Sequence, residues 1–274
     1  MFDSYIVSNT KTSLSMPLAC PPPPRKLKHS KGFKRFAFTL AETLITLTII
    51  GVIAALTVPN LLNKYTKHTY VVGLKKAYSQ LQNAVKMIPI TEGCSAGDYD
   101  CAGMFQDWNK VTNIDGMNFN GNVAVKQLYL ISKNLKTSDI ILEYDDERCF
   151  DAAGDWTKLL PCIILQDGMI FASYSEGNLV VDVNGQKGPN KHGRDRFMFY
   201  LSYETFNSYG IETGVFHHAG AVIPFGSQAD ANYNKRPQDY WKNSLACNLE
   251  NVNKDAWSAV SCTGRVLEED AMNY

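Results

Sequence analysis

The chain has 274 residues, enough for one large domain or two small ones, and its 45 % hydrophobic content can form a buried core. The formal net charge is zero, but residues 1–37 hold seven Lys or Arg and one acid, which leaves 20 basic and 26 acidic residues in the remainder. An acidic main part argues against a general nucleic-acid-binding function. A basic N-terminal segment ahead of an apolar run is instead an orientation signal for a membrane protein.

The N-terminal 37 residues have the character of a processing segment rather than of a folded element. Four consecutive prolines follow Cys20, and proline lacks the backbone donor that a helix needs. The sequence does not distinguish Met1 from Met16 as the start of translation. The segment ends in a dense basic cluster made of Arg25, Lys26, Lys28, Lys31, Lys34 and Arg35.

A long apolar run follows this cluster, and Glu42 is the only charged residue between Phe36 and Asn63. The twenty residues Thr43–Leu62, rising about 1.5 Å each in a helix, are long enough for a hydrocarbon core of about 30 Å. The run is too long for the apolar region of a secretory signal, and no A-x-A cleavage site follows it. Because the basic cluster comes first, we expect a cytoplasmic N-terminus and an extracytoplasmic C-terminal domain.

Three residues make this segment more specific than a plain signal anchor. Glu42 places a carboxylate at the edge of an apolar helix, which costs about 2–3 kcal/mol and therefore requires a partner. Gly51 permits close approach of a second helix. Pro59 removes one backbone hydrogen bond and is expected to kink or loosen the helix.

The junction formed by KRFA at 34–37 and FTLAE at 38–42 resembles the N-terminal motif of the type IV prepilin and type II secretion pseudopilin superfamily. The resemblance implies that a prepilin peptidase cuts between Ala37 and Phe38 and methylates the new amine of Phe38. The residue before the cut is usually Gly in this family, and here it is the small Ala37. After cleavage, Glu42 becomes the fifth residue and Pro59 the twenty-second, positions that carry these residue types in many members.

The same resemblance implies a single-pass protein of the bacterial inner membrane that later enters a pilus or pseudopilus filament. The implied partners are the prepilin peptidase, other pilin or pseudopilin subunits that bind through the N-terminal helix, the inner-membrane assembly platform, and membrane lipid before assembly. No nucleic-acid partner is expected. The mature chain is large for a major pilin, which favours a minor subunit.

Beyond Pro59 the apolar spacing becomes that of a surface helix. Leu74, Tyr78, Leu81, Val85 and Ile88 recur at intervals of three and four residues, which predicts one apolar stripe on a helix over 63–88. Pro89 and Gly93 are expected to end this helix. The resemblance implies one continuous helix, with its first half in the membrane and its second half packed on a sheet.

The rest of the chain predicts an α+β fold with an antiparallel sheet and disulfide-bonded loops, which the resemblance makes pilin-like. Residues 94–122 are expected to be loops, and 123–135 a short helix. Strands are expected at 162–165 and 169–174, joined in a hairpin, and at 179–183 and 196–201. The predicted organisation is a leader at 1–37, a transmembrane half-helix at 38–62 and a globular domain at 63–274.

Six of the seven cysteines follow the apolar run, and no CxxC or zinc-finger spacing occurs among them. A translocated domain favours disulfides over reduced core cysteines. Six cysteines allow fifteen pairings, and short loops close most easily. This favours Cys94–Cys101, Cys149–Cys162 and Cys247–Cys262.

The loop at 182–195 offers carboxylate and amide oxygens between two predicted strands. Calcium prefers such ligands, and some pseudopilins carry a calcium-binding loop in a comparable region. However, the D-x-N-G start lacks the remainder of an EF-hand, and basic residues oppose a dication, so a turn closed by its own Asp and Asn side chains is favoured. The candidate calcium ligands are Asp182, Asn184, Asn190 and Asp195.

No catalytic constellation is expected, because neither a nucleophile elbow nor an H-E-x-x-H motif is present. We therefore expect a non-enzymatic filament subunit, and no cofactor other than the calcium ion considered above. Two alternatives share the same architecture: a minor pilin that acts as a binding or adhesin module, and a membrane-anchored extracytoplasmic binding protein. The sequence does not distinguish a pilus from a secretion pseudopilus.

Overall fold

A computed structural model describes residues 39–105, 115, 119, 122–150, 159–175, 177–202, 220–227 and 247–274. The chain divides into two units, one up to Val52 and one from Ile53 onward, and each is described by itself. The main elements in chain order are α1 (Leu40–Thr91), α2 (Val123–Ser132), β1 (Thr137–Ile141), β2 (Cys162–Leu165), β3 (Ile170–Ser175), β4 (Asn178–Asp182), β5 (Arg196–Leu201), β6 (Val222–Pro224), α4 (Leu249–Asn253), a 3₁₀ helix (Trp257–Ser261) and α5 (Cys262–Glu269).

The six described strands form one antiparallel sheet in the order β1-β2-β3-β4-β5-β6, so that each strand pairs with its neighbour in sequence. The β2–β3 hairpin pairs Cys162 with Ala172 and Ile164 with Ile170 across a short turn. A long apolar helix combined with an antiparallel sheet and disulfides is the α+β arrangement that the sequence predicts.

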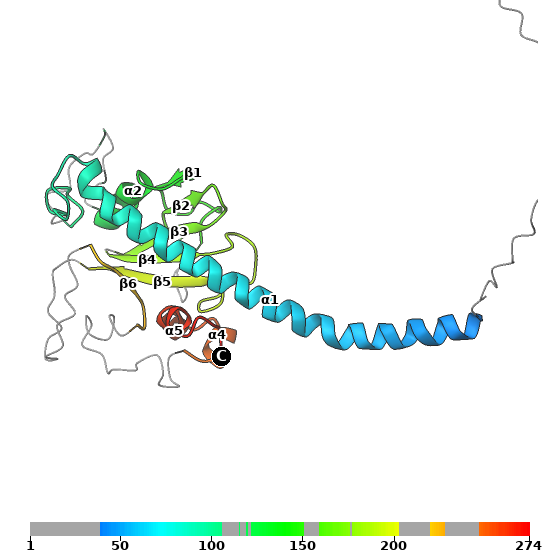
Figure 1. Cartoon of the computed structure of the whole chain (residues 1–274). Helices are drawn as coiled ribbons and strands as arrows, with labels where there is room; N and C mark the ends of the chain where they lie inside the picture. The colour runs from blue at the N-terminus through cyan, green and yellow to red at the C-terminus, as the bar shows by residue number, and fades with distance from the viewer. Residues whose placement is uncertain are drawn as a thin grey trace, which may run out of the picture. The chain divides into compact units, whose positions relative to one another are not determined.

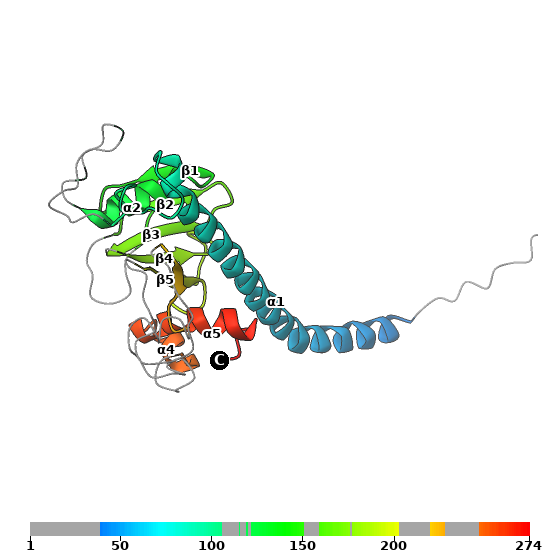
Figure 2. The ribbon, with the colours of Figure 1, turned by 60° about the vertical axis from the view of Figure 1, so that its left-hand side comes forward.

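The second half of α1 lies across one face of this sheet, as Figures 1 and 2 both show. The predicted stripe is buried there, with Leu74, Leu81, Val85 and Ile88 at 0 % exposure. Tyr78 is half-buried, and its ring stacks on Phe199 with centroids 5.6 Å apart. Alternate strand residues point to this face, as the two-residue period of a strand requires. They include Ile163, Leu165, Phe171, Leu179, Val181, Phe197, Phe199 and Leu201.

The other face of the sheet is also covered, which explains why its strands carry almost continuous apolar runs. Ile170, Val180 and Met198 point away from α1 and pack in a second cluster. Phe150, Phe225 and Val260, from the segments after β1, after β6 and before α5, complete this cluster.

Helix α1 ends three residues later than the sequence predicts. Pro89 lies inside the last turn, where it removes one backbone donor but leaves the helical path intact through Thr91. Gly93 then adopts a positive φ of 77°, and the Cys94 N–H donates to Pro89 O at 2.8 Å, which closes the helix end.

Three disulfides join Cys94 to Cys101, Cys149 to Cys162 and Cys247 to Cys262. These are the pairings that the short-loop argument favours. The second disulfide ties the segment after β1 to the first residue of β2, and the third ties the segment before α4 to the first residue of α5. Two short strands, β1 and β6, and the C-terminal helices were not predicted.

Candidate functional site

The residues expected to act in assembly lie in the first half of α1. Glu42, Gly51 and Pro59 are all helical and exposed. The predicted cleavage site, Ala37 and Phe38, lies outside the described residues.

Glu42 forms a reciprocal cap with Thr39 at the start of α1. The Glu42 Oε2 atom accepts hydrogen bonds from the Thr39 N–H at 2.9 Å and from the Thr39 hydroxyl at 2.8 Å. In return, the Glu42 N–H donates to Thr39 Oγ1 at 3.2 Å. This is the capping-box arrangement of a Thr with a Glu three residues later, and it satisfies two donors at the exposed helix end.

The apolar segment of α1 leaves its large side chains uncovered. Those from Leu40 to Leu62 are between 47 and 78 % exposed. The threonine hydroxyls of the segment donate to carbonyls of the preceding turn at 2.8–2.9 Å, from Thr43 to Leu40, Thr46 to Thr43, Thr48 to Leu44 and Thr57 to Ile53. Because each hydroxyl is satisfied within the helix, it can enter hydrocarbon without an unpaired donor.

Gly51 and Pro59 leave the helix regular but modify its surface and its hydrogen bonding. A Cβ placed on Gly51 would meet nothing within 4 Å, so that the position presents an open, shallow surface. Pro59 lies within the continuous helix, although it cannot donate to the Ala55 carbonyl. By length and composition, α1 is the described helix that could cross a membrane.

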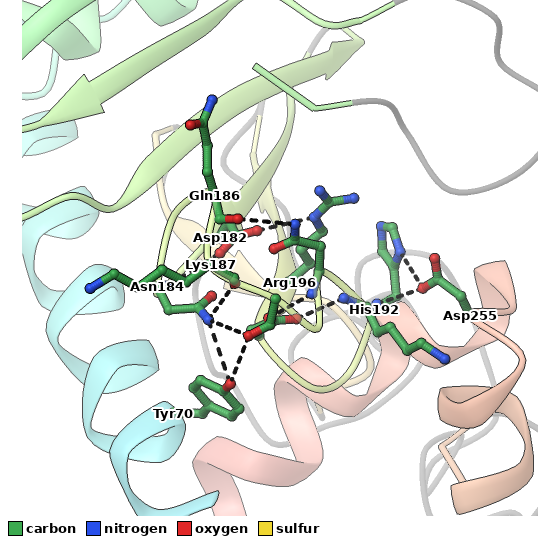
Figure 3. Close-up of polar contacts among 12 residues, drawn as sticks. Tyr70, Asp182, Asn184, Gln186, Lys187, His192, Arg196 and Asp255 are labelled. Carbon is green, nitrogen blue, oxygen red and sulfur yellow. Dashed lines mark hydrogen bonds and ion pairs between the residues drawn. The ribbon is translucent and has the colours of Figure 1, made fainter. Parts of the chain in front are cut away.

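The second group of predicted residues lies in the loop between β4 and β5, where Figure 3 shows a network of polar contacts. Asp182 and Arg196 face each other in the β4–β5 register, and Arg196 Nε donates to Asp182 Oδ2 at 3.1 Å. The Arg196 guanidinium also lies over the ring of Phe150, 4.5 Å from its centroid. The pKa of Asp182 is raised to about 7, chiefly by burial and also by the nearby charge of Asp195, while Arg196 acts in the opposite direction.

Backbone groups of the loop satisfy the second carboxylate. Asp195 accepts from the Asn190 N–H at 2.8 Å and from the Lys191 N–H at 2.7 Å. Burial nevertheless raises its pKa, although these hydrogen bonds act in the opposite direction. Asn184 donates through its side chain to the carbonyls of Lys187 at 2.6 Å and Gly188 at 3.2 Å. The loop is thus closed by its own Asp and Asn side chains.

Two more distant residues hold this loop against the rest of the domain. Asp255 accepts from the His192 N–H at 2.7 Å, and His192 Nδ1 lies 3.1 Å from the same oxygen (Figure 3). Burial raises the pKa of Asp255, but the His192 hydrogen bonds outweigh this effect and leave it below its usual value. On the opposite side, Asn184 Nδ2 lies 3.5 Å from the hydroxyl of Tyr70 in α1.

This geometry bears on the candidate calcium ligands without testing them. The carboxylates of Asp182 and Asp195 are engaged by Arg196 and by loop N–H groups, and Asn184 and Asn190 line the same loop. Within the part of the chain that the structure describes, no three His, Cys, Asp or Glu side chains are grouped to hold a metal ion. Calcium binding here stays a prediction, and it would have to compete with these hydrogen bonds.

Three residues of these sites were not predicted from the sequence. The cap formed by Thr39 has a signal there, because T-x-x-E before an apolar run is a capping-box signature. Arg196 becomes the partner of Asp182 only when the β4–β5 register is known. Asp255 meets His192 across 63 residues of sequence, and no local pattern indicates that contact.

No protein-family model, curated protein or solved structure matches this chain.

Proposed function

We propose that the chain is a prepilin-like subunit of a type II secretion pseudopilus or a type IV pilus. In this proposal, prepilin peptidase cuts before Phe38, and Thr43–Leu62 anchors the mature protein in the bacterial inner membrane. The domain from residue 63 onward is extracytoplasmic and pilin-like. The subunit is non-enzymatic, of low abundance, and joins other pilin-like subunits at the assembly platform through its N-terminal helix.

The observation that carries this proposal is the exposed apolar half of α1 with Glu42 as its only charge. A water-soluble domain rarely leaves so long an apolar surface uncovered, so this surface calls for lipid or for other helices. The same helix continues into a half that packs on an antiparallel sheet. Three disulfides support an oxidising compartment for the folded end.

Two other functions suit the same architecture: a minor pilin whose domain binds a surface or a secreted substrate, and a membrane-anchored binding protein that never polymerises. The first shares cleavage and assembly with our proposal. The second requires neither, so processing and filament incorporation separate the cases.

Processing is tested by mass spectrometry of the protein from cells with an active prepilin peptidase. We expect an N-terminus at Phe38, carrying an N-methyl group. An intact leader, or an N-terminus at another residue, would exclude a prepilin.

Assembly is tested with Glu42→Ala, Glu42→Asp and the control Thr39→Val, each checked first for membrane insertion and cleavage. An unpaired carboxylate and an unpaired ammonium are both unfavourable in a bundle of apolar helices, so we propose that Glu42 binds the Phe38 amine of a neighbouring subunit. Glu42→Ala should then insert and be cleaved but be depleted from sheared fibres, with Glu42→Asp intermediate.

Thr39→Val removes the hydroxyl of the cap but retains the Glu42 charge, so it should enter fibres at nearly the wild-type level. If Thr39→Val is as defective as Glu42→Ala, Glu42 acts only as a helix cap. If Glu42→Ala assembles normally, the role of Glu42 in assembly is refuted.

A further inference from the structure

A pocket lies where the first exposed turns of α1 after the apolar run meet the C-terminal segment. Its volume is about 340 Å³, and it is lined by Lys64, Lys67, His68 and Val71 on one side and by residues 270–273 on the other. The four α1 residues recur at three- and four-residue intervals, so they share one face of the helix. The pocket therefore has a basic wall on α1 and a wall formed by the chain end.

The C-terminal wall is fixed by Lys67, whose Nζ donates to Met272 O at 2.9 Å and to Tyr274 O at 3.1 Å. Asp270, the acid of this wall, forms an ion pair with Lys75 at 2.5 Å. Figure 2 shows the C-terminus beside α1, in agreement with these contacts. The acid of the pocket is thus already paired, and the pocket retains a basic character.

Of the residues that line the pocket, Lys64 and His68 are exposed, whereas Val71 is buried at 2 % exposure. The site accordingly combines a lysine ammonium and an imidazole with a buried apolar side chain. This combination suits an amphipathic ligand that has a phosphate at one end.

The position of the pocket along α1 indicates which phosphate it meets. The apolar run ends at Leu62, and at about 1.5 Å per residue Lys64 lies roughly 3 Å and His68 roughly 9 Å beyond it. The headgroup layer on each side of a bilayer is about 5–8 Å thick, so Lys64 lies at headgroup depth and His68 at the outer edge of this layer. Tyr65, 69 % exposed, is on the same turns, and tyrosine is typical of this interfacial layer.

The sign of the charge also requires an explanation. In the orientation proposed above, Lys64 and Lys67 lie on the extracytoplasmic side, and the positive-inside rule places lysines preferentially on the other side. Two lysines directly after the span therefore serve no purpose in orienting the chain. Lys67 is accounted for by its hydrogen bonds to the C-terminal segment, and a local anionic partner accounts for the place of Lys64.

We propose that this pocket binds the phosphate of an anionic phospholipid in the outer leaflet of the inner membrane. Lys64 and His68 contact the headgroup, and Lys67 positions the C-terminal wall. The inference rests on the proposed membrane anchoring, and it adds a lipid site that holds the folded domain at a fixed height above the bilayer before assembly.

The test uses the full chain in nanodiscs of equimolar phosphatidylglycerol and phosphatidylcholine, with lipid adducts counted by native mass spectrometry. Because the leader is also basic, only variants that share it are compared. We expect wild-type protein to retain phosphatidylglycerol in preference to phosphatidylcholine. Lys64→Gln should lower that preference about fivefold, because this is the effect of removing one basic charge at an anionic surface. Lys64→Arg should preserve it, and His68→Gln should reduce it.

The matched control is Lys86→Gln, an exposed lysine of the same helix about 33 Å farther along its axis, and it should leave the preference unchanged. The proposed site is refuted if Lys86→Gln lowers the preference for phosphatidylglycerol as much as Lys64→Gln does, or if Lys64→Gln does not lower it. Release of the lipid by soluble glycerol phosphate at the same concentration would show a free-phosphate site instead. A Lys64→Gln effect on dimer abundance at constant lipid ratio would assign the pocket to a second copy.

Membrane insertion is measured separately, by resistance to alkaline extraction. Loss of lipid preference in a chain that still inserts refutes only the pocket. Failure of wild-type protein to insert refutes the proposed anchoring itself.

Discussion

The buried pair of Asp182 and Arg196 predicts an unusual dependence of stability on pH. Asp182 is fully buried, and its pKa is raised from 3.8 to about 7. A carboxyl with a raised pKa in the folded state stabilises the fold at low pH, and this contribution is lost as the pH rises from about 4 through 7. At about 1.4 kcal/mol per pKa unit, the loss amounts to about 4 kcal/mol.

The variant that isolates this effect is Asp182→Asn, which keeps the shape of the side chain but does not ionise. We expect the melting temperature of wild-type protein relative to this variant to fall by about 10 °C between pH 4 and pH 7, at 2–4 °C per kcal/mol for a domain of this size. Circular dichroism of the full chain in detergent micelles provides the measurement. The titrating groups that do not interact with Asp182 remain unchanged in both proteins, so their contributions cancel; Asp195, which does interact with it, belongs to the effect being measured.

The control is Asp270→Asn: its side chain is 68 % accessible and its ion pair with Lys75 is exposed to solvent, so the variant should stay close to the wild-type pH curve. Parallel curves for wild type and Asp182→Asn would refute the reasoning. They would mean that Arg196 compensates the buried charge completely.

Three further changes follow from the packing and from the loop. Gly185→Ala should destabilise the domain by more than 1 kcal/mol, because φ is +67° and the new Cβ would lie 2.2 Å from Gly168 O; a melting temperature equal to wild type would contradict this. Leu81→Ala, at a fully buried position of α1, should lower the unfolding free energy by about 2–5 kcal/mol. Its control Val72→Ala, at 52 % exposure on the same helix, should change the unfolding free energy by less than about 0.5 kcal/mol. If calcium binds the 182–195 loop, millimolar calcium should raise the melting temperature of the full chain and Asp182→Ala should abolish the rise; the absence of a shift favours a loop closed by hydrogen bonds alone.

The elements that the sequence predicts well are those whose pattern is dictated by burial. Strand β5 matches its expected bounds, Arg196–Leu201, because an apolar strand buried on both faces carries a continuous signal. Strand β1 (TSDII) is an edge strand with alternating exposure and only one fully buried residue, so its apolar signal is weak. Strand β6 has only three residues and includes a proline.

Helix α5 shows why a local pattern can mislead. Gly264 lies inside this helix, where glycine is unfavourable by about 1 kcal/mol. A Cβ at this position would lie 2.3 Å from the Ser227 backbone nitrogen, so the close approach of the segment after β6 selects glycine. Tertiary contact overrides helix propensity here, and a single sequence does not reveal that contact. The pairing of His192 with Asp255 is hidden for the same reason.

Glu42 combines a local role that the structure displays with the assembly role that we propose, and the two roles use different atoms. Both hydrogen bonds from Thr39 end on Oε2. Among the described residues, none donates a hydrogen bond to Oε1 at the distances observed here for Oε2. The cap therefore holds the carboxylate through Oε2 and lowers the cost of carrying it at the end of an apolar helix. A preoriented carboxylate loses less side-chain entropy when it meets an amine from a neighbouring subunit, so capping favours the proposed intermolecular pair rather than competing with it.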